Sequence, residues 1–253
     1  MLQCMLIHGL GGTPLEMRYI AAALEAAGLE THSLTLPGHD ARVTDYLRVS
    51  YADWREHVLA EHARLAARGP VLSVGFSLGG LLTLDLAEQV AEHCPLAGMA
   101  LLAAPVRLFS WHPFFMVDWR LPFAGLVRRL MPVVHYPARS EEQQAVAPWR
   151  GYDGITVTRH VADMLAAMRR VRAGLGRITA PALIWQARGD MTCRAWNAFH
   201  IARRLGSADV TLRLVDIRNR QAGHHLLPTH VETREPVATS VRDFAVRLTG
   251  ACG

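Results

Sequence analysis

The sequence predicts an α/β fold: a mostly parallel sheet of about six strands, with helices on both faces and a cap inserted into the chain. Short apolar runs alternate with amphipathic helical patterns along the 253 residues. Such alternation implies right-handed crossovers between parallel strands that are covered on both faces. One segment between two strands, 106–179, is far longer than a single crossover, and we interpret it as the cap. Residues 1–105 and 180–253 then form the core.

Six runs have the length and residue types of strands. Most are continuously apolar and end at a turn residue, as Val71–Val74 does at Gly75, and two of them alternate apolar and polar residues. In chain order they are Leu2–Ile7, Leu29–Leu36, Val71–Val74, Ala97–Ala103, Ala182–Trp185 and Val210–Ile217.

Helical patterns lie between these strands. The first begins with Thr13 as a candidate N-cap and Pro14 in the first helical position, the one place where a helix tolerates proline well. The predicted helices are Pro14–Ala27, Asp53–Arg68, Leu78–Glu92, Ala195–Leu205 and Val237–Leu248, with a further helical stretch around Val161–Arg172 in the inserted segment.

The composition of the inserted segment differs from that of the rest. It holds 11 Arg and 5 acidic residues, a balance of +6, whereas the remainder holds 16 and 17. It also contains nine of the chain's 18 aromatic residues. Two interpretations stay open for each feature. The aromatics line a substrate pocket, with Trp111, Phe114, Phe115 and Trp119 as candidates, or they only attach the cap to the sheet. The basic charge contacts anionic lipid weakly, or it is a solvated helix face.

Several classes of function are excluded or disfavoured. All 27 basic residues are Arg, so the chain has no Schiff-base lysine and no P-loop lysine. We find no clustered Cys and His spacing typical of a metal site, and we expect no cofactor.

The four Cys show no paired spacing and the N-terminus does not read as a signal peptide, so we expect free thiols and a cytoplasmic protein. A nucleic-acid partner is not expected, because no basic helix carries interleaved stacking aromatics. The oligomeric state stays open.

A glycine-rich run, Gly75-Phe76-Ser77-Leu78-Gly79-Gly80, follows one predicted strand and opens a helix. In that context the Ser sits on a strained turn, so its neighbours two positions away must be small. The turn exposes the Ser77 hydroxyl at the sheet edge and directs the helix N-terminus toward it. We therefore predict Ser77 as a nucleophile; the alternative is a Ser that only caps the helix.

A serine nucleophile needs a base and a carboxylate that orients the base. Asp190 follows a predicted strand at the sheet edge where active residues collect, whereas its rival Asp216 lies within a strand. The base is expected from Ala222-Gly223-His224-His225, a loop after the last strand. Consecutive side chains point apart, so only one of the two His should reach Ser77. We favour His224 from the Gly-His pattern.

The oxyanion of the reaction needs two N–H donors. The backbone N–H of Leu78, directly after the nucleophile, is one candidate, and that of Leu10 is the other, because glycines flank Leu10 on both sides. His8 and His39 lie in the turns after the first two strands. For both we expect a structural role in fixing these loops by hydrogen bonds.

Taken together, these pieces resemble the α/β-hydrolase superfamily, and within it the bacterial carboxylesterases close to monoacylglycerol lipases. The matching pieces are His8-Gly9-Leu10-Gly11-Gly12, Pro37-Gly38-His39, Trp54, Gly75–Gly80, Ala104-Pro105, Pro181–Asp190 and Gly223-His224. The resemblance implies hydrolysis of carboxylic esters through an acyl-enzyme, with Ser77, Asp190 and His224 as triad. The chain departs from the family after Asp190, where the usual Pro-containing turn is absent, and in the cap, which sets the substrate.

The leading hypothesis is thus a serine hydrolase of carboxylic esters acting on a small-molecule ester or acyl lipid. A thioesterase or lysophospholipase on the same fold stays open. So do a perhydrolase or C–C hydrolase, and a ligand-binding module in which the serine pocket only captures a small molecule.

Overall fold

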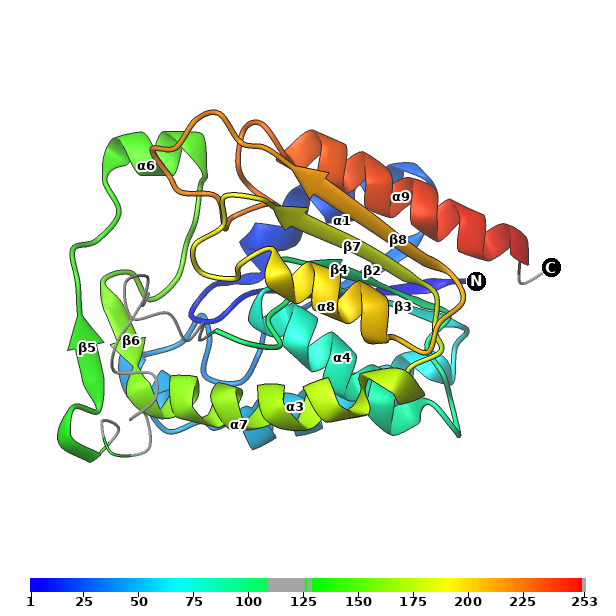
Figure 1. Ribbon diagram of the computed structural model, residues 1–253, viewed down its shortest axis with the longest axis horizontal. Coiled ribbons are helices and arrows are strands. Elements are labelled where there is room, and N and C mark those ends of the chain that lie inside the picture. Colours follow the sequence, from blue (N-terminus) through cyan, green and yellow to red (C-terminus); the bar gives the residue numbers. More distant parts are fainter. Residues whose placement is uncertain (109–125, 127–128, 252–253) are drawn as a thin grey trace.

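A computed structural model of the chain describes residues 1–108, 126 and 129–251. Six strands form one parallel sheet in the order β2-β1-β3-β4-β7-β8 (Figure 1). All six predicted strands are confirmed, with shifts of one to two residues at most ends: β1 (Gln3–Ile7), β2 (Glu30–Leu34), β3 (Val71–Phe76), β4 (Gly98–Leu102), β7 (Ala182–Ala187) and β8 (Val210–Val215). The parallel pairing of all six strands confirms the predicted α/β class.

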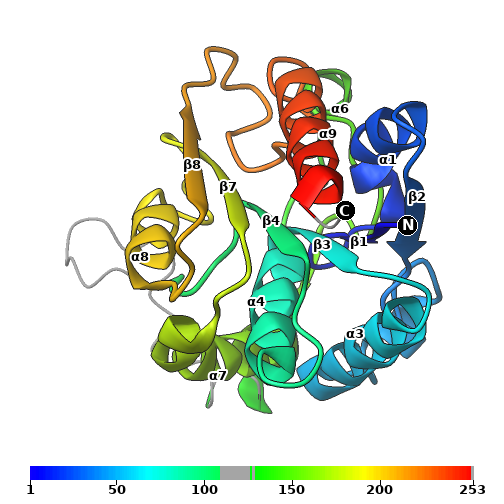
Figure 2. The ribbon, with the colours of Figure 1, turned by 90° about the vertical axis from the view of Figure 1, so that its right-hand side faces the viewer.

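Helices cover both faces of the sheet (Figure 2). On one face lie α1 (Arg18–Ala26) and α9 (Arg234–Ala251), which pack against each other and against the sheet. On the other face lie α3 (Tyr51–Ala66), α4 (Leu78–Val90) and α8 (Trp196–Arg204). The central strands are buried on both faces, which explains why they are mainly apolar in sequence.

The helix after β1 begins differently from its prediction. Thr13 takes the extended N-cap backbone and Pro14 the first position, but the Thr13 hydroxyl makes no capping hydrogen bond. The first turn is a short 3-10 helix, η1 (Pro14–Met17), which then continues as α1. A further short helix, α2 (Val43–Tyr46), follows the turn after β2.

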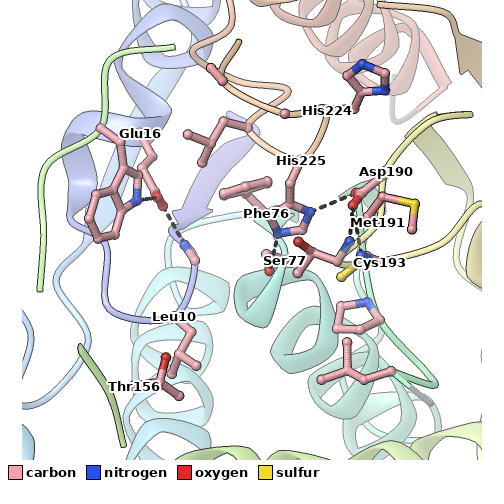
Figure 3. A pocket seen from close by; sticks show the side chains of 18 of the residues that line it. Leu10, Glu16, Phe76, Ser77, Thr156, Asp190, Met191, Cys193, His224 and His225 are labelled. Atoms are coloured by element: carbon pink, nitrogen blue, oxygen red, sulfur yellow. Dashed lines mark hydrogen bonds and ion pairs between the residues drawn. The ribbon is translucent and has the colours of Figure 1, made fainter. Parts of the chain in front are cut away.

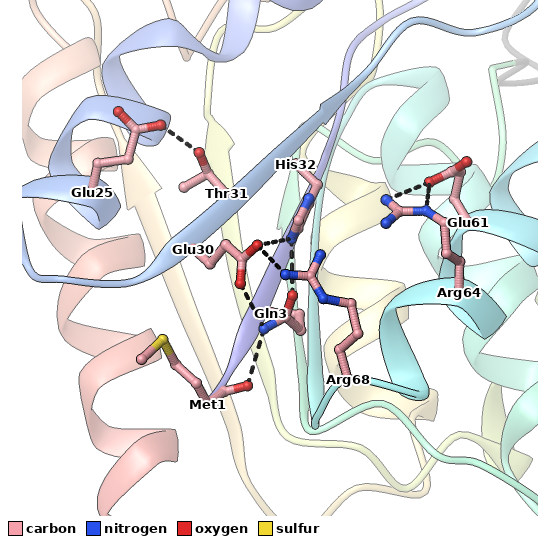
Figure 4. Close-up of polar contacts among 9 residues, drawn as sticks. All are labelled: Met1, Gln3, Glu25, Glu30, Thr31, His32, Glu61, Arg64 and Arg68. Carbon is pink, nitrogen blue, oxygen red and sulfur yellow. Dashed lines mark hydrogen bonds and ion pairs between the residues drawn. The ribbon is translucent and has the colours of Figure 1, made fainter.

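The edge strand β2 is joined to its neighbours by polar side chains (Figure 4). The Gln3 amide donates to the Glu30 carboxylate at 3.1 Å, and the Arg68 guanidinium, beyond the end of α3, donates to the same carboxylate at 2.5 Å. His32 contacts the Gln3 amide oxygen at 3.0 Å. These charged side chains leave β2 a poor template for pairing with another strand.

The inserted segment has two parts. In the first, β5 (Val133–His135) and β6 (Ile155–Val157) pair antiparallel and flank α6 (Glu141–Val146). In the second, α7 (Thr158–Gly174) lies beside α4 and α3, where Met164 and Met168 join the hydrophobic core of that face; η3 (Leu175–Arg177) follows. The last helix of the segment therefore packs against the sheet together with the core helices. We propose a cap only for the part of the segment before α7. The pocket candidates Trp111, Phe114, Phe115 and Trp119 lie outside the described residues.

Of the helices that the structure describes, none combines the length and the apolar composition needed to cross a membrane. Cys4, Cys94 and Cys193 are free thiols, and Cys4 and Cys193 are buried.

Candidate active site

Ser77 occupies the turn between β3 and α4. Its backbone has φ 52° and ψ −113°, a conformation that non-glycine residues rarely adopt, and its N–H donates to the Leu102 carbonyl at 2.9 Å. A Cβ atom on Gly75 would overlap the Gly79 carbonyl, and one on Gly79 would overlap the Ile7 carbonyl. The glycine-rich run thus forms the strained strand-to-helix turn that the sequence predicts, with its glycines required by close backbone approach.

Replacing Gly79 with Ala is expected to lower the free energy of unfolding by about 1–3 kcal/mol, because the added methyl must push α4 away from β1. Urea unfolding would measure the change. Gly250→Ala is the matched control: nothing lies near this exposed position in α9, so alanine should leave stability unchanged or raise it by up to about 1 kcal/mol. Equal stability of Gly79→Ala and the wild type would contradict the packing argument.

Asp190 lies just past the end of β7 and its side chain is fully buried. One of its carboxylate oxygens accepts hydrogen bonds from the backbone N–H groups of Thr192 at 2.8 Å and Cys193 at 2.9 Å. The other accepts from the Gln186 amide at 3.2 Å. The rival Asp216 is 78% exposed and pairs with Arg188, so the structure brings Asp190 and not Asp216 to the site.

The structure corrects the histidine. His225, not His224, lies between the two residues, with its Nε2 2.9 Å from the Ser77 hydroxyl and its Nδ1 2.7 Å from the Asp190 carboxylate (Figure 3). Consecutive side chains diverge, as expected, but Gly223 at φ 69° turns the loop so that the second His faces inward. His224 points away from Ser77 and lies over the backbone of Gly189. The Gly-His pattern carried no information about this rotation.

The Asp190 carboxylate controls the charge of His225. Burial disfavours the imidazolium, but the negative charge of Asp190 and its hydrogen bond to Nδ1 outweigh burial and raise the pKa of His225 above its ordinary value. Because Asp190 accepts the Nδ1 proton, Nε2 of neutral His225 is left free to accept the Ser77 proton. The three residues can therefore transfer a proton from the hydroxyl to the imidazole.

Two other histidines fix the loops, as predicted. The Leu36 N–H donates to His8 Nε2 at 3.2 Å, so His8 Nδ1 carries the proton that is shared with the Gly9 carbonyl at 2.8 Å. The Gly11 N–H donates to His39 Nε2 at 3.0 Å. Burial lowers the pKa of His8 to about 4 and that of His39 to about 3, which keeps both rings neutral as these contacts require.

A cavity of about 840 Å³ opens above Ser77. Leu10 lines it from the loop after β1, the position that the prediction of an oxyanion donor requires, while Leu78 is buried at the first position of α4. The inserted segment contributes both apolar and charged walls, including Leu108, Tyr136, Arg139, Trp149, Asp153 and Met164. In the part of the chain that the structure describes, no three His, Cys, Asp or Glu side chains gather so as to hold a metal ion.

Glu16 was not predicted from the sequence. It lies in the first turn of a predicted helix, where an acidic residue is ordinary, and so nothing in the pattern singled it out. In the structure Glu16 is buried at the cavity wall, and burial raises the pKa of its carboxyl to about 7. Only the three-dimensional structure therefore reveals it as a candidate functional residue.

Comparison with known proteins agrees with the fold. The family model described as serine aminopeptidase, S33, matches residues 2–227. The chain is 28% identical over 216 residues to a thermostable monoacylglycerol lipase of Bacillus sp. (strain H-257), covering 85% of this chain and 80% of that protein.

Solved structures are similar along nearly the whole chain. One belongs to the metagenome-derived lipolytic enzymes LipS and LipT, with a TM-score of 0.81, 21% identity and coverage of 97% of this chain and 94% of that one. Another is the monoacylglycerol lipase of Paleococcus ferrophilus, with a TM-score of 0.75, 16% identity and the same coverage, 97% and 94%. At these identities the likeness shows the fold alone.

Proposed function

Since the chain belongs to the serine aminopeptidase S33 family of α/β hydrolases, we propose that it cleaves carboxylic esters through an acyl-enzyme on Ser77. The observation that carries the proposal is the continuous hydrogen-bonded chain from the Ser77 hydroxyl through His225 to the buried Asp190. A buried carboxylate that orients the base of a strained, accessible serine is the arrangement that nucleophilic catalysis needs.

In this mechanism His225 Nε2 takes the Ser77 proton as the Ser77 oxygen attacks the ester carbonyl carbon. The negative charge that develops on the carbonyl oxygen is stabilised by the backbone N–H groups of Leu10 and Leu78. Collapse of the tetrahedral intermediate expels the alcohol, which leaves with the proton from His225. Water, deprotonated by His225, then releases the acid, while Asp190 stabilises the imidazolium at both stages.

We further propose an acyl ester of a small alcohol as substrate. Apolar side chains such as Leu10, Leu108 and Met164 line the cavity and suit an acyl chain. Proteins similar to this chain in sequence or in structure include two named monoacylglycerol lipases. Contact of the basic insert with anionic lipid has less support, because Arg170 and Arg177 pair with the core residues Asp85 and Glu88 and so do not contribute free charge.

A panel of p-nitrophenyl esters of graded acyl length, a monoacylglycerol and matched thioesters tests the function. We expect turnover of the esters to exceed that of the thioesters, with one preferred range of acyl length, and labelling of Ser77 by a fluorophosphonate probe. Faster thioester cleavage would favour a thioesterase. Labelling without ester or thioester turnover would favour another reaction on this serine, and the absence of labelling would favour a ligand-binding module.

A further inference from the structure

The carboxyl of Glu16 is held between two N–H donors that come from different parts of the chain. Its Oε2 accepts from the backbone N–H of Gly9, in the loop after β1, at 2.6 Å. Its Oε1 accepts from the indole Nε1 of Trp149, in the inserted segment, at 2.5 Å (Figure 3). The residue is only 2% exposed. Burying a carboxylate is costly unless hydrogen bonds replace its water, and these two bonds offset part of that cost.

The loop between β1 and η1 is shaped around this side chain. A Cβ atom on Gly12 would lie 2.5 Å from Glu16 Oε1, and one on Gly9 would lie 3.3 Å from Oε2. The glycines therefore leave the room that the carboxyl fills. Leu10, the candidate oxyanion donor, stands between them, directly after the residue whose N–H Glu16 accepts.

The inserted segment touches the same loop at a second point. The Tyr152 N–H donates to the Gly11 carbonyl at 2.8 Å. Glu16 and Tyr152 thus connect both ends of the loop to the insert, but only Glu16 does so through a side chain that also lines the catalytic cavity.

We infer that Glu16 is a positioning residue for the proposed hydrolysis: by bridging Gly9 and Trp149 it holds the Leu10 N–H where the oxyanion develops. The inference rests on the proposed function. Its physical basis is that an oxyanion donor acts only when it is held in place before the reaction, and small displacements of such groups reduce turnover strongly.

Protonation of Glu16 removes one of the two acceptors, because the carboxyl then presents an O–H to one of two N–H donors. His225 is the charged group that acts on this carboxyl from across the cavity, and Arg139 and Asp153 of the insert line the same cavity. With the pKa of Glu16 raised to about 7, the bridge is complete above neutral pH and is lost as pH falls. His225 must also be neutral to act as base, so two protonations reduce wild-type activity on the acid side.

The test uses Glu16→Gln, which keeps the shape but leaves a single carbonyl for two donors. We expect kcat for a short p-nitrophenyl ester to fall by about 10-fold with KM nearly unchanged. In the wild type the acid limb of log kcat/KM against pH should exceed a slope of one over about one pH unit, because a roughly tenfold effect of Glu16 protonation adds one log unit to the fall, whereas Glu16→Gln should follow a slope near one throughout. Glu25→Gln is the matched control, since Glu25 lies exposed on α1 and bonds only the Thr31 hydroxyl among the described contacts (Figure 4).

A rescue separates positioning from general damage. Trp149→Phe removes the indole N–H and keeps an aromatic ring, so in the double variant the carbonyl of the introduced amide side chain, free of the competing donor, can accept from Gly9. We expect Glu16→Gln/Trp149→Phe to recover about threefold in kcat over Glu16→Gln. Thermal unfolding of each variant shows that it is folded at the assay temperature.

Unchanged kcat in folded Glu16→Gln, or a double variant no better than the single one, would overturn the inference while wild-type activity upholds the proposed function. A wild-type protein that neither labels with fluorophosphonate nor cleaves the ester would instead overturn the proposed function, and this inference with it.

Discussion

Replacing Ser77 with Ala is expected to lower kcat/KM for esters by about 10⁴-fold or more and to abolish fluorophosphonate labelling. The Ser77 hydroxyl, 2.9 Å from His225 Nε2, is the nucleophile of the proposed mechanism, and no acyl-enzyme can form without it. Initial rates on a short p-nitrophenyl ester measure the effect. The residual rate reports what the remaining groups achieve by binding the substrate alone.

Ser73→Ala is the matched control for this loss. Ser73 lies in β3, the strand that leads to the nucleophile, and its hydroxyl bonds only that of Thr83 at 2.9 Å among the described contacts. Removing it should cost about 1 kcal/mol of stability and leave kcat/KM within about twofold of the wild type. Ester turnover retained by Ser77→Ala, with Ser73→Ala equally active, would show that another group is the nucleophile.

The strands of the sheet were predictable because their burial is visible in short stretches of sequence. Four strands are buried on both faces and so read as mainly apolar runs, interrupted only by Gln3, Ser73 and Gln186. Parallel crossovers then leave few topologies open. The place of the insert's last helix was less predictable, because α7 is amphipathic in the same way as the core helices, and only its packing beside α4 reveals that it belongs with them.

The candidate site likewise contains residues that the sequence could indicate and residues that it could not. Ser77 directly follows β3 and Asp190 comes shortly after β7, so the position of each residue after a predicted strand was enough to propose it. The proposed base lies on a loop after Gly223, whose φ is 69°, and there no strand register fixes which of two adjacent rings points inward. Glu16 depends on Trp149, 133 residues away in sequence, and no local pattern encodes such a contact.

The adjacent histidines allow a direct test of that loop geometry. His225→Ala is expected to lower kcat/KM by about 10⁴-fold or more, since neither the proton transfer from Ser77 nor the link to Asp190 survives. His224→Ala should change kcat/KM by no more than about threefold, because its ring faces away from Ser77 and only borders the cavity. Both substitutions remove the same atoms from neighbouring positions, so each controls for the other. If His224→Ala were the inactive variant, the loop would have to adopt the opposite rotation about Gly223 during catalysis, and the triad would be Ser77, Asp190 and His224.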